Sequence, residues 1–319
     1  MQIHPNCSED EVLVAAKALK DGQLVVFPTE TVYGLGADAT NKTAVDRLYK
    51  VKERPKNHPL IIHISTVNLI KEWCNKIPEY ATLLAETFWP GPMTLILPKK
   101  VDTPSFATGQ QKTVGLRIPS HSVANLLLKK FESFGGIGIA APSANIFSFV
   151  SPTSADHARN DIGFKLSSKD LILDGGRSSI GLESTIIDCT KNVPKILRPG
   201  AVTHNHIENL LQIKIRSKKS KSEIRHSGSF NNHYSPRAEL VLNKSVKKGD
   251  GFLALRIHPT PTGAIRLASP NTLEEFANVL YHSLRQGDNL GLNRICAIIP
   301  DGDDLALAIQ DRLIKASNK

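Results

Sequence analysis

The sequence predicts an α/β protein of two domains, a larger one built on a mixed sheet and a smaller one of the same class. Short apolar and β-branched runs alternate with segments of helical periodicity along the chain, as in layered α/β folds. The length of 319 residues is long for one hydrophobic core and comfortable for two domains. A polar stretch over 213–236 has little apolar periodicity and is expected to link them.

The first helix and the first strand have clear boundary signals. Ser8 with Glu11 three residues later forms a capping box, and Gly22 is expected to end the helix that follows. The apolar run 24–27 then predicts a buried strand, which Pro28 ends.

The alternation continues to the C-terminus. In the first domain we expect helices at 44–49, 78–89 and 122–131, and strands at 60–64, 93–97, 113–118, 137–141, 171–173, 185–189 and 195–197. After the linker we expect strands at 240–242, 252–257 and 296–299, and helices at 273–286 and 305–316. These elements divide the chain into a first domain over 1–203, a linker over 204–236 and a small Rossmann-like α/β domain over 237–319.

Composition and charge restrict the class of protein. Four cysteines (Cys7, Cys74, Cys189 and Cys296) are scattered without a C-x-x-C pair, so we expect buried thiols in a reducing compartment. The sequence shows no signal-peptide pattern and no long apolar run, so we expect a soluble cytoplasmic protein without a membrane partner. The formal net charge of +10 suggests acidic partners such as nucleotides or RNA. Part of this charge is a basic run over 216–225, and such runs are more often solvated faces than specific RNA contacts.

The densest group of polar residues lies over 27–63. The hydroxyls and the carboxylate at 29–31 follow the predicted strand, where open α/β sheets bind ligands. Pro55 disfavours the helical conformation for Arg54, so Lys52 and Arg54 are expected on an extended, exposed segment. There the two cations would point to one side as a clamp for phosphate or carboxylate oxygens. The alternative for such a charge triplet is a solvated helix end.

A G-x-G-x-x-G/A pattern over 34–39 resembles a dinucleotide-binding fingerprint. Its first glycine comes seven residues after the last apolar strand residue, whereas the fingerprint needs it at the strand's end. We therefore interpret the match as chance. The glycines are expected to let the backbone turn and approach a ligand closely.

Further polar residues lie at predicted strand ends or turns. Thr113 and Arg117 are four apart on one strand and are expected to face the same side, where a guanidinium suits a carboxylate. Ser143 and Asn145 follow Pro142 and offer a hydroxyl and an amide, although such a pair is also typical of a turn.

The remaining candidates are loop and strand-end residues. Ser151 and Thr153 precede a helical segment that Thr153 is expected to cap, which would point free N–H groups at an anion. Ser184 and Arg198 lie at strand ends. His63 ends an apolar strand, where a histidine is more often a packed core residue than a ligand.

At least eight motifs, taken in order, resemble those of the YrdC-type threonylcarbamoyl-AMP synthases. They cover nearly the whole chain, and one motif at the end of the linker resembles the signature of the long, two-domain form. The motifs are FPTETVYGLGADA, KERPKNHPLIIH, WPGPMTLIL, VGLRIPSH, APSAN, SPT, DGG with GLESTI, LRPG and, in the linker, HYSP. The resemblance implies a YrdC-like twisted mixed sheet with helices for the first domain.

The resemblance also implies how the residues divide between two substrates. L-threonine would be surrounded by Thr31, His63, Arg117, Ala141 and Ser184, with Arg117 facing its carboxylate. ATP would be held by Lys52, Arg54, His58, Thr113, Ser143, Asn145, Ser151 and Arg198, with Tyr234 of the linker closing over it. Lys52 and Arg54 would be the catalytic pair that neutralises phosphate charge.

The implied reaction joins L-threonine, bicarbonate or CO₂, and ATP into L-threonylcarbamoyl-AMP and releases pyrophosphate. Catalysis would come from positioning and charge neutralisation, with Mg²⁺ on the ATP phosphates and no protein nucleophile. A separate tRNA threonylcarbamoyl transferase would consume the product, so this protein need bind RNA only weakly, if at all.

Two other classes of protein stay open beside the synthase. A non-catalytic RNA-binding protein would use the same basic surface, although 6% aromatic residues and no RNP-like aromatic strand argue against base stacking. A carbamoyl-transfer maturation enzyme has a similar domain, but it would need acylphosphatase-like and zinc-finger modules, and C-x-x-C pairs are missing. The synthase is therefore favoured.

Overall fold

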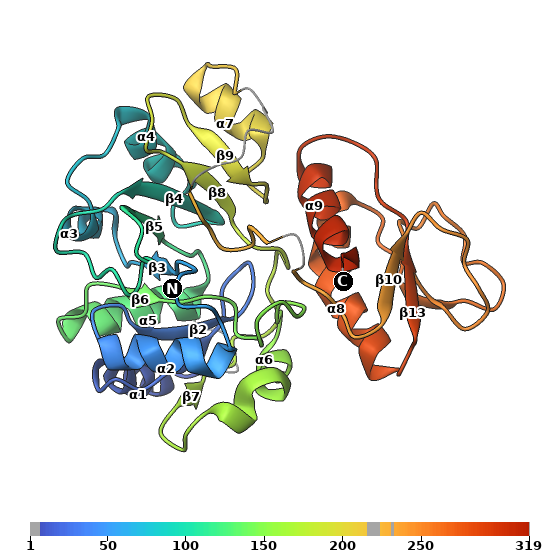
Figure 1. Ribbon diagram of the computed structural model, residues 1–319, viewed down its shortest axis with the longest axis horizontal. Helices are drawn as coiled ribbons and strands as arrows, with labels where there is room; N and C mark the ends of the chain where they lie inside the picture. Colours follow the sequence, from blue (N-terminus) through green and yellow to red (C-terminus); the bar gives the residue numbers. More distant parts are fainter. Residues whose placement is uncertain (1–6, 216–223, 231–232, 319) are drawn as a thin grey trace.

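The computed structural model describes residues 7–215, 224–230 and 233–318 as two α/β bodies side by side (Figure 1). The larger sheet contains β1 (Val25–Phe27), β2 (Gly34–Asp38), β3 (Ile61–His63), β4 (Met93–Pro98), β5 (Thr113–Arg117), β6 (Ile139–Ala140), β7 (Leu171–Ile172), β8 (Thr185–Asp188) and β9 (Lys195–Arg198). Their order is β7-β1-β2-β6-β3-β5-β4-β8-β9. β3 and β5 are parallel whereas β4 and β5 are antiparallel, so the predicted mixed sheet is confirmed.

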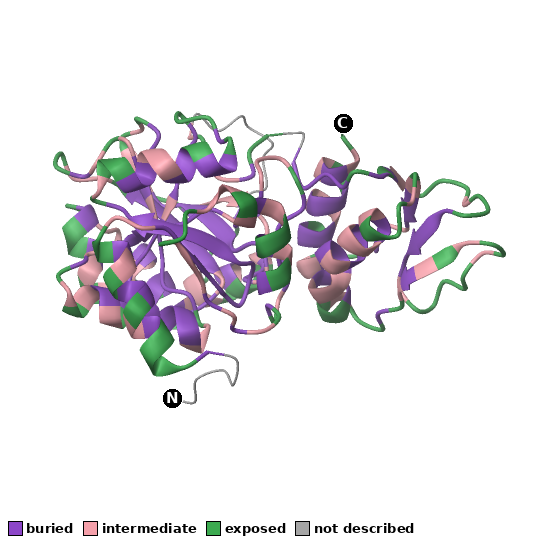
Figure 2. Ribbon diagram, turned by 90° about the horizontal axis from the view of Figure 1, so that it is seen from below, coloured by how far each residue is buried: buried purple, intermediate pink, exposed green. Residues whose placement is uncertain are grey.

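Helices cover both faces of the larger sheet (Figure 2). They are α1 (Glu9–Lys20), α2 (Lys42–Lys52), α3 (Ile70–Trp73), α4 (Glu79–Phe88), α5 (Ser122–Ser133), α6 (Ala155–Ile162) and α7 (His204–Leu211), with 3₁₀ turns η1 (Val67–Leu69) and η2 (Gly163–Lys165). α1 and α5 pack together on one face, where Leu19 and Leu127 join Phe27. α2 and α4 contribute Leu48 and Leu84 to the main cluster on the other face. Both faces of the sheet are therefore buried.

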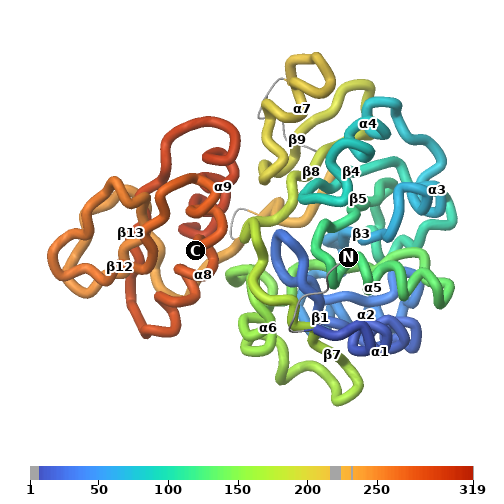
Figure 3. Tube along the Cα trace, turned by 180° about the vertical axis from the view of Figure 1, so that it is seen from behind, coloured from blue at the N-terminus to red at the C-terminus, as the bar shows by residue number. Residues whose placement is uncertain are grey.

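The second domain is a small parallel sheet with two helices. It contains β10 (Glu239–Leu242), β11 (Gly251–Leu253), β12 (Ile265–Ala268), β13 (Arg294–Ala297), α8 (Leu273–Asn289) and α9 (Leu305–Ser317), with strand order β10-β13-β11-β12. All its strand pairs are parallel. Seen from behind, α8 and α9 lie between this sheet and the first domain (Figure 3).

The apolar core of the second domain continues into the first. Phe276, Leu280 and Ile309 of α8 and α9 belong to one buried cluster with Val150 and Leu182 of the first domain. The two domains thus share buried surface, which favours a fixed arrangement over independent motion.

Local sequence signals place most of the expected elements to within about three residues, whereas the strand expected at 252–257 already ends at Leu253. Ser8 and Glu11 form the expected capping box, in which the Ser8 backbone N–H donates to Glu11 over 2.7 Å. The strand over 24–27 is observed as β1, and all three of its residues are buried. The four cysteines are buried and free, as expected.

Several elements were not predicted. β2 spans the glycine-rich segment, so its glycines lie in a strand and not in the expected turn; Gly36 leaves room for the Phe27 ring above it. β12 and α7 also escaped prediction. α7 lies inside the segment assigned to the linker, and its Ile207 packs on the first core. We therefore propose that the first domain extends through α7 and that the linker follows it.

Part of the linker lies outside the described residues, namely 216–223 and 231–232, and with it most of the basic run. Among the described helices none is long and apolar enough to cross a membrane.

We predict that Gly36 is required for packing between β2 and its neighbours. A Cβ at this position would lie 2.9 Å from Ile139 and 3.0 Å from the Phe27 ring. Gly36→Ala is therefore expected to lower the free energy of unfolding by about 1–3 kcal/mol through overpacking. Gly115→Ala on β5 is the matched control, because its Cβ would meet nothing closer than 3.5 Å. Urea denaturation measures both variants, and equal stability would contradict the packing argument.

Candidate active site

One pocket gathers most of the predicted site residues against the linker. His63 and Arg117 reach it from the ends of the parallel strands β3 and β5, the place where α/β sheets bind ligands. Nine candidates line it, namely Thr31, Arg54, His63, Arg117, Ala141, Ser143, Ser184, Arg198 and Tyr234. Five do not, namely Lys52, His58, Thr113, Asn145 and Ser151.

Arg117 is held rigidly by the loop after β1. Its Nη2 forms a 2.6 Å ion pair with Glu30, its Nη1 donates to Thr31 Oγ1 over 2.9 Å, and its Nε donates to the Gly91 carbonyl. Arg117 and Glu30 are both about 95% buried at the side chain. Within the described part of the chain these contacts use three of the five guanidinium N–H groups, which leaves two for a ligand.

His63 provides a neutral ring beside this guanidinium. Burial, reinforced by the charge of Arg117, lowers the pKa of His63 to about 3, so the imidazole is uncharged at neutral pH. Its ring meets Phe27 edge-on at 5.8 Å, and its Nδ1 finds no partner among the described residues. The residue is therefore packed in the core, as its position suggested, and at the same time lines the pocket.

Lys52 does not lie on an extended, exposed segment, and that prediction was wrong. It is the last residue of α2, which Glu53 ends in the left-handed conformation (φ 54°). Its Nζ donates to the carbonyls of Ser143 and Asn145 at 2.5 Å each. Burial lowers the pKa of Lys52 well below its usual value, and the nearby charge of Arg54 adds to this. The ammonium thus anchors the 143–145 loop from behind.

Arg54 lies on the pocket side and is also buried, contrary to the expected exposed clamp. Its Nη2 contacts His58 Nδ1 at 2.9 Å and donates to the Pro59 carbonyl at 2.9 Å and to Ser227 Oγ at 3.3 Å. Burial lowers the pKa of Arg54 to about 10, which still leaves it charged at neutral pH. The two cations therefore have different surroundings: Lys52 fixes a loop, and Arg54 lines the cavity.

The loop held by Lys52 turns through Asn145. The Asn145 side-chain amide donates to the carbonyls of Ile146 and Phe149 at 2.7 and 2.8 Å, so it closes a turn, as the alternative predicted. Its Oδ1 has no partner among the described residues. Ser143 remains on the pocket wall.

Ser184 and Arg198 form the opposite wall. Arg198 donates from Nε to the Ser184 carbonyl at 3.0 Å and from Nη2 to Ser184 Oγ at 3.1 Å. Its Nη1 donates to the Ser227 carbonyl of the linker at 3.1 Å. Arg198 thus joins β9, the start of β8 and the linker.

Ser151 faces Glu183, a pocket residue that the sequence analysis did not single out. Its Oγ donates to Glu183 Oε1 over 2.6 Å. The signal was present in the sequence, because Glu183 directly precedes Ser184. Thr153 does not cap α6; Ser154 does, by accepting from the His157 N–H.

Thr113 and His58 lie at the margin of the pocket. Thr113 lines a smaller adjoining cavity that shares Ile61 and Ser227 with the main pocket. The His58 ring stacks on Phe230 of the linker with ring centroids 4.6 Å apart. Both are therefore near the site without facing its centre.

Tyr234 is enclosed between the two domains. Its ring stacks on Tyr281 at 5.6 Å and lies under the Arg312 guanidinium at 5.4 Å, so it packs against the second domain. It also lines the pocket, and its hydroxyl has no partner among the described residues. Phe230, by contrast, packs on the first domain.

A protein-bound metal centre is not evident in the described part of the chain. No group of three or more His, Cys, Asp or Glu side chains there is placed to hold an ion.

Comparison with known proteins identifies the family. A family model described as "Telomere recombination" matches residues 17–200, and one described as "Threonylcarbamoyl-AMP synthase, C-terminal domain" matches residues 202–318. The threonylcarbamoyl-AMP synthase of Pyrococcus abyssi is 38% identical over 99% of this chain and 97% of its own. That of Bacillus subtilis is 34% identical over 97% and 94%. The chain therefore belongs to the threonylcarbamoyl-AMP synthase family.

A solved structure agrees with this assignment. The crystal structure of P. abyssi Sua5 complexed with L-threonine matches with a TM-score of 0.87 and 36% identity, covering 99% of this chain and 96% of that one. The predicted family, its two-domain form and the α/β fold class are confirmed.

We predict that Lys52 stabilises the protein through the 143–145 loop. Lys52→Ala leaves two buried carbonyls unpaired, at a cost of about 1–3 kcal/mol each, so the free energy of unfolding should fall by about 2 kcal/mol or more. Lys56→Ala is the control, since this lysine is exposed and forms a surface ion pair with Asp46. Chemical denaturation compares the two. If Lys52→Ala is as stable as the wild type, the loop does not depend on the Lys52 ammonium, and this group would be assigned to direct contact with a ligand.

Proposed function

We propose that this protein makes L-threonylcarbamoyl-AMP from L-threonine, bicarbonate or CO₂, and ATP, and releases pyrophosphate. Family membership over the whole chain supports the activity. The observation that carries the proposal is one pocket with two groups of cationic side chains, which we call its two halves. Arg117 lies beside the neutral His63 on the neighbouring strand, whereas Arg54 and Arg198 both contact Ser227 of the linker.

The first half suits an amino acid. Arg117 retains two N–H groups, which match the two oxygens of a threonine carboxylate in a bidentate contact. Thr31, Ala141 and Ser184 complete the proposed threonine site with His63. The relative solved with L-threonine has the same fold, which supports this choice of substrate.

The second half suits a nucleotide. Arg54 and Arg198 are buried cations that would attract the phosphates of ATP, and Ser143 lines the same pocket. His58 and Thr113 line the margin, where the nucleoside would extend. In this proposal Lys52, Asn145 and Ser151 act from behind the wall, and Tyr234 covers the nucleotide from the linker.

The chemistry needs positioning and charge neutralisation. The amine of threonine must be uncharged to capture CO₂, and the resulting carbamate oxygen attacks the α-phosphorus while pyrophosphate leaves. Arg54 would neutralise the leaving group, and Mg²⁺, when bound with ATP, would supply further positive charge. Burial of the pocket would exclude water and protect the labile mixed anhydride.

The product must be used by a second enzyme. We propose that a separate tRNA threonylcarbamoyl transferase takes it, in the cytoplasm, and modifies adenosine beside the anticodon. The rival RNA-binding function has less support, because two relatives that match nearly the whole chain are both threonylcarbamoyl-AMP synthases. The rival maturation enzyme would be larger, whereas the two curated relatives match this chain over at least 94% of their own length.

Pyrophosphate release tests the function. Purified protein supplied with ATP, Mg²⁺ and bicarbonate should release pyrophosphate only when L-threonine is added, and not with L-valine or L-serine at equal concentration. Threonylcarbamoyl-AMP should appear in equal amount by mass spectrometry. Release that ignores threonine, or RNA binding without any turnover, would refute the synthase.

A variant of Arg117 tests whether the two halves of the pocket bind different ligands. Arg117→Ala should weaken threonine binding about tenfold or more, the effect of losing a charged hydrogen bond, while the affinity for an ATP analogue changes little. Glu30→Gln is the control, because it breaks the same ion pair and keeps the guanidinium. Calorimetry with each ligand gives both affinities. Equal weakening of both ligands in Arg117→Ala would assign Arg117 to the phosphates or to folding.

A further inference from the structure

Glu183 is a carboxylate of the first domain that receives two donors from the second. Ser151 Oγ donates to its Oε1 over 2.6 Å. Tyr281 of α8 and Arg312 of α9 donate to its Oε2, each over 2.8 Å. Tyr281 and Arg312 are completely buried, and they lie 98 and 129 positions away from Glu183 in the sequence.

The charge of this carboxylate depends on these donors. Burial by itself raises the pKa of Glu183, but the charges of Arg312 and Arg198 and the hydrogen bond from Ser151 outweigh it and hold the pKa at about 2. A buried carboxylate is tolerated only when it is paired and hydrogen-bonded. Removing Arg312 would therefore leave a buried charge that must move toward water or take up a proton.

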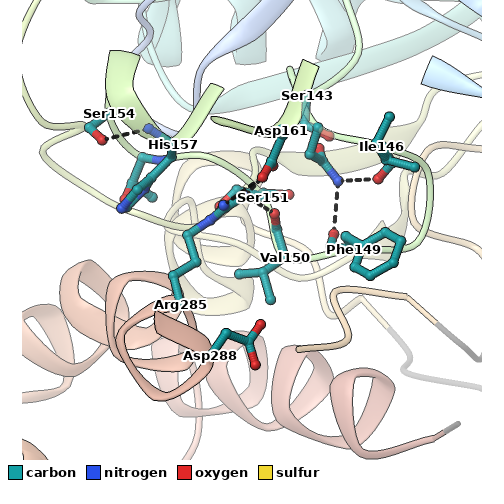
Figure 4. A network of polar contacts seen from close by, with 12 residues as sticks. Ser143, Ile146, Phe149, Val150, Ser151, Ser154, His157, Asp161, Arg285 and Asp288 are labelled. Carbon is teal, nitrogen blue, oxygen red and sulfur yellow. Dashed lines mark hydrogen bonds and ion pairs between the residues drawn. The ribbon is translucent and has the colours of Figure 1, made fainter. Parts of the chain in front are cut away.

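A second arginine of the same domain holds the backbone of Ser151. Arg285 of α8 reaches across the interface to Asp161, with its Nη1 at 3.0 Å from Oδ1 (Figure 4). The same guanidinium donates to the carbonyls of Val150 and Ser151. The second domain thus fixes Ser151 twice, at its carbonyl directly and at its hydroxyl through Glu183.

The contacts described for the threonine half have a different origin. Arg117 is held by Glu30, Thr31 and Gly91, and His63 lies at the end of β3, all in the first domain. Any influence of α8 and α9 through Glu183 should therefore be felt by the nucleotide half alone.

We propose that Arg312 and Tyr281 are positioning residues through which the second domain completes the nucleotide half of the pocket. They hold the Glu183 carboxylate in place, and Glu183 in turn orients the Ser151 hydroxyl. The same two side chains enclose the ring of Tyr234 between them. This inference rests on the proposed function for the identity of the ligand, an adenine nucleotide.

A simpler role is that these residues only dock one domain on the other. Asn278 of α8 provides a matched control for docking. Its side-chain amide donates to the carbonyls of Ser178 and Ser179 at 2.9 Å, across the same interface, without any contact to Glu183. If docking alone matters, Asn278→Ala and Arg312→Met should alter the two ligand affinities in the same pattern.

The test measures binding of two ligands to the full chain. A non-hydrolysable ATP analogue and L-threonine are titrated separately by calorimetry into wild type, Arg312→Met, Arg312→Lys and Asn278→Ala. We expect Arg312→Met to weaken the analogue by about 10- to 100-fold, the range for losing a supporting partner. Threonine affinity should stay within about twofold, Arg312→Lys should recover part of the loss, and Asn278→Ala should change neither.

Two outcomes would overturn the inference. One is wild-type affinity for the analogue in folded Arg312→Met, and the other is equal loss of both ligands. If Arg312→Met fails to fold, Tyr281→Phe takes its place, because it removes one hydroxyl and keeps the ring. It should weaken the analogue about fivefold, the effect of one lost hydrogen bond of about 1 kcal/mol, and unchanged affinity would overturn the inference. Wild type that binds both ligands and releases no pyrophosphate would refute the proposed function and leave this inference standing.

Discussion

Glu183 keeps a negative charge inside the protein, between two domains, because Arg312 and Tyr281 meet it from one side and Ser151 from the other. A buried carboxylate without such partners would be strongly destabilising. This ion pair crosses the domain interface beside Tyr234 and beside the Ser151 loop, which Arg285 also holds. It joins elements that the chain order keeps far apart.

The same rule governs the other buried charges. Lys52 is tolerated in the core because two carbonyls accept hydrogen bonds from its Nζ, and Arg117 is tolerated because Glu30 balances its charge. Each of these partners also fixes a segment of the pocket wall. The donors that a substrate would meet are therefore already oriented, and preorganised donors need little rearrangement when charge develops. The contacts that stabilise these buried charges therefore also orient the donors of the proposed site.

The linker also contacts the buried side chains of the pocket. Its Ser227 accepts from both Arg54 and Arg198, and Tyr234, which takes a positive φ of 66°, passes between the domains. A side chain in that backbone conformation persists only where its surroundings hold it. Its neighbours Tyr281 and Arg312 supply that support. The linker is thus part of the pocket wall as well as a connection.

The sequence alone determined the alternation of elements, the capping box at Ser8 and the order of motifs that bring nine candidates into one pocket. These signals are local, because a cap or a strand period is complete within a few residues. Tertiary structure alone decided where each buried polar group finds its partner. Lys52 reaches carbonyls more than ninety positions away, and Glu183 meets helices of another domain. Spacing along the chain cannot reveal such contacts, since they depend on which segments the whole fold brings together.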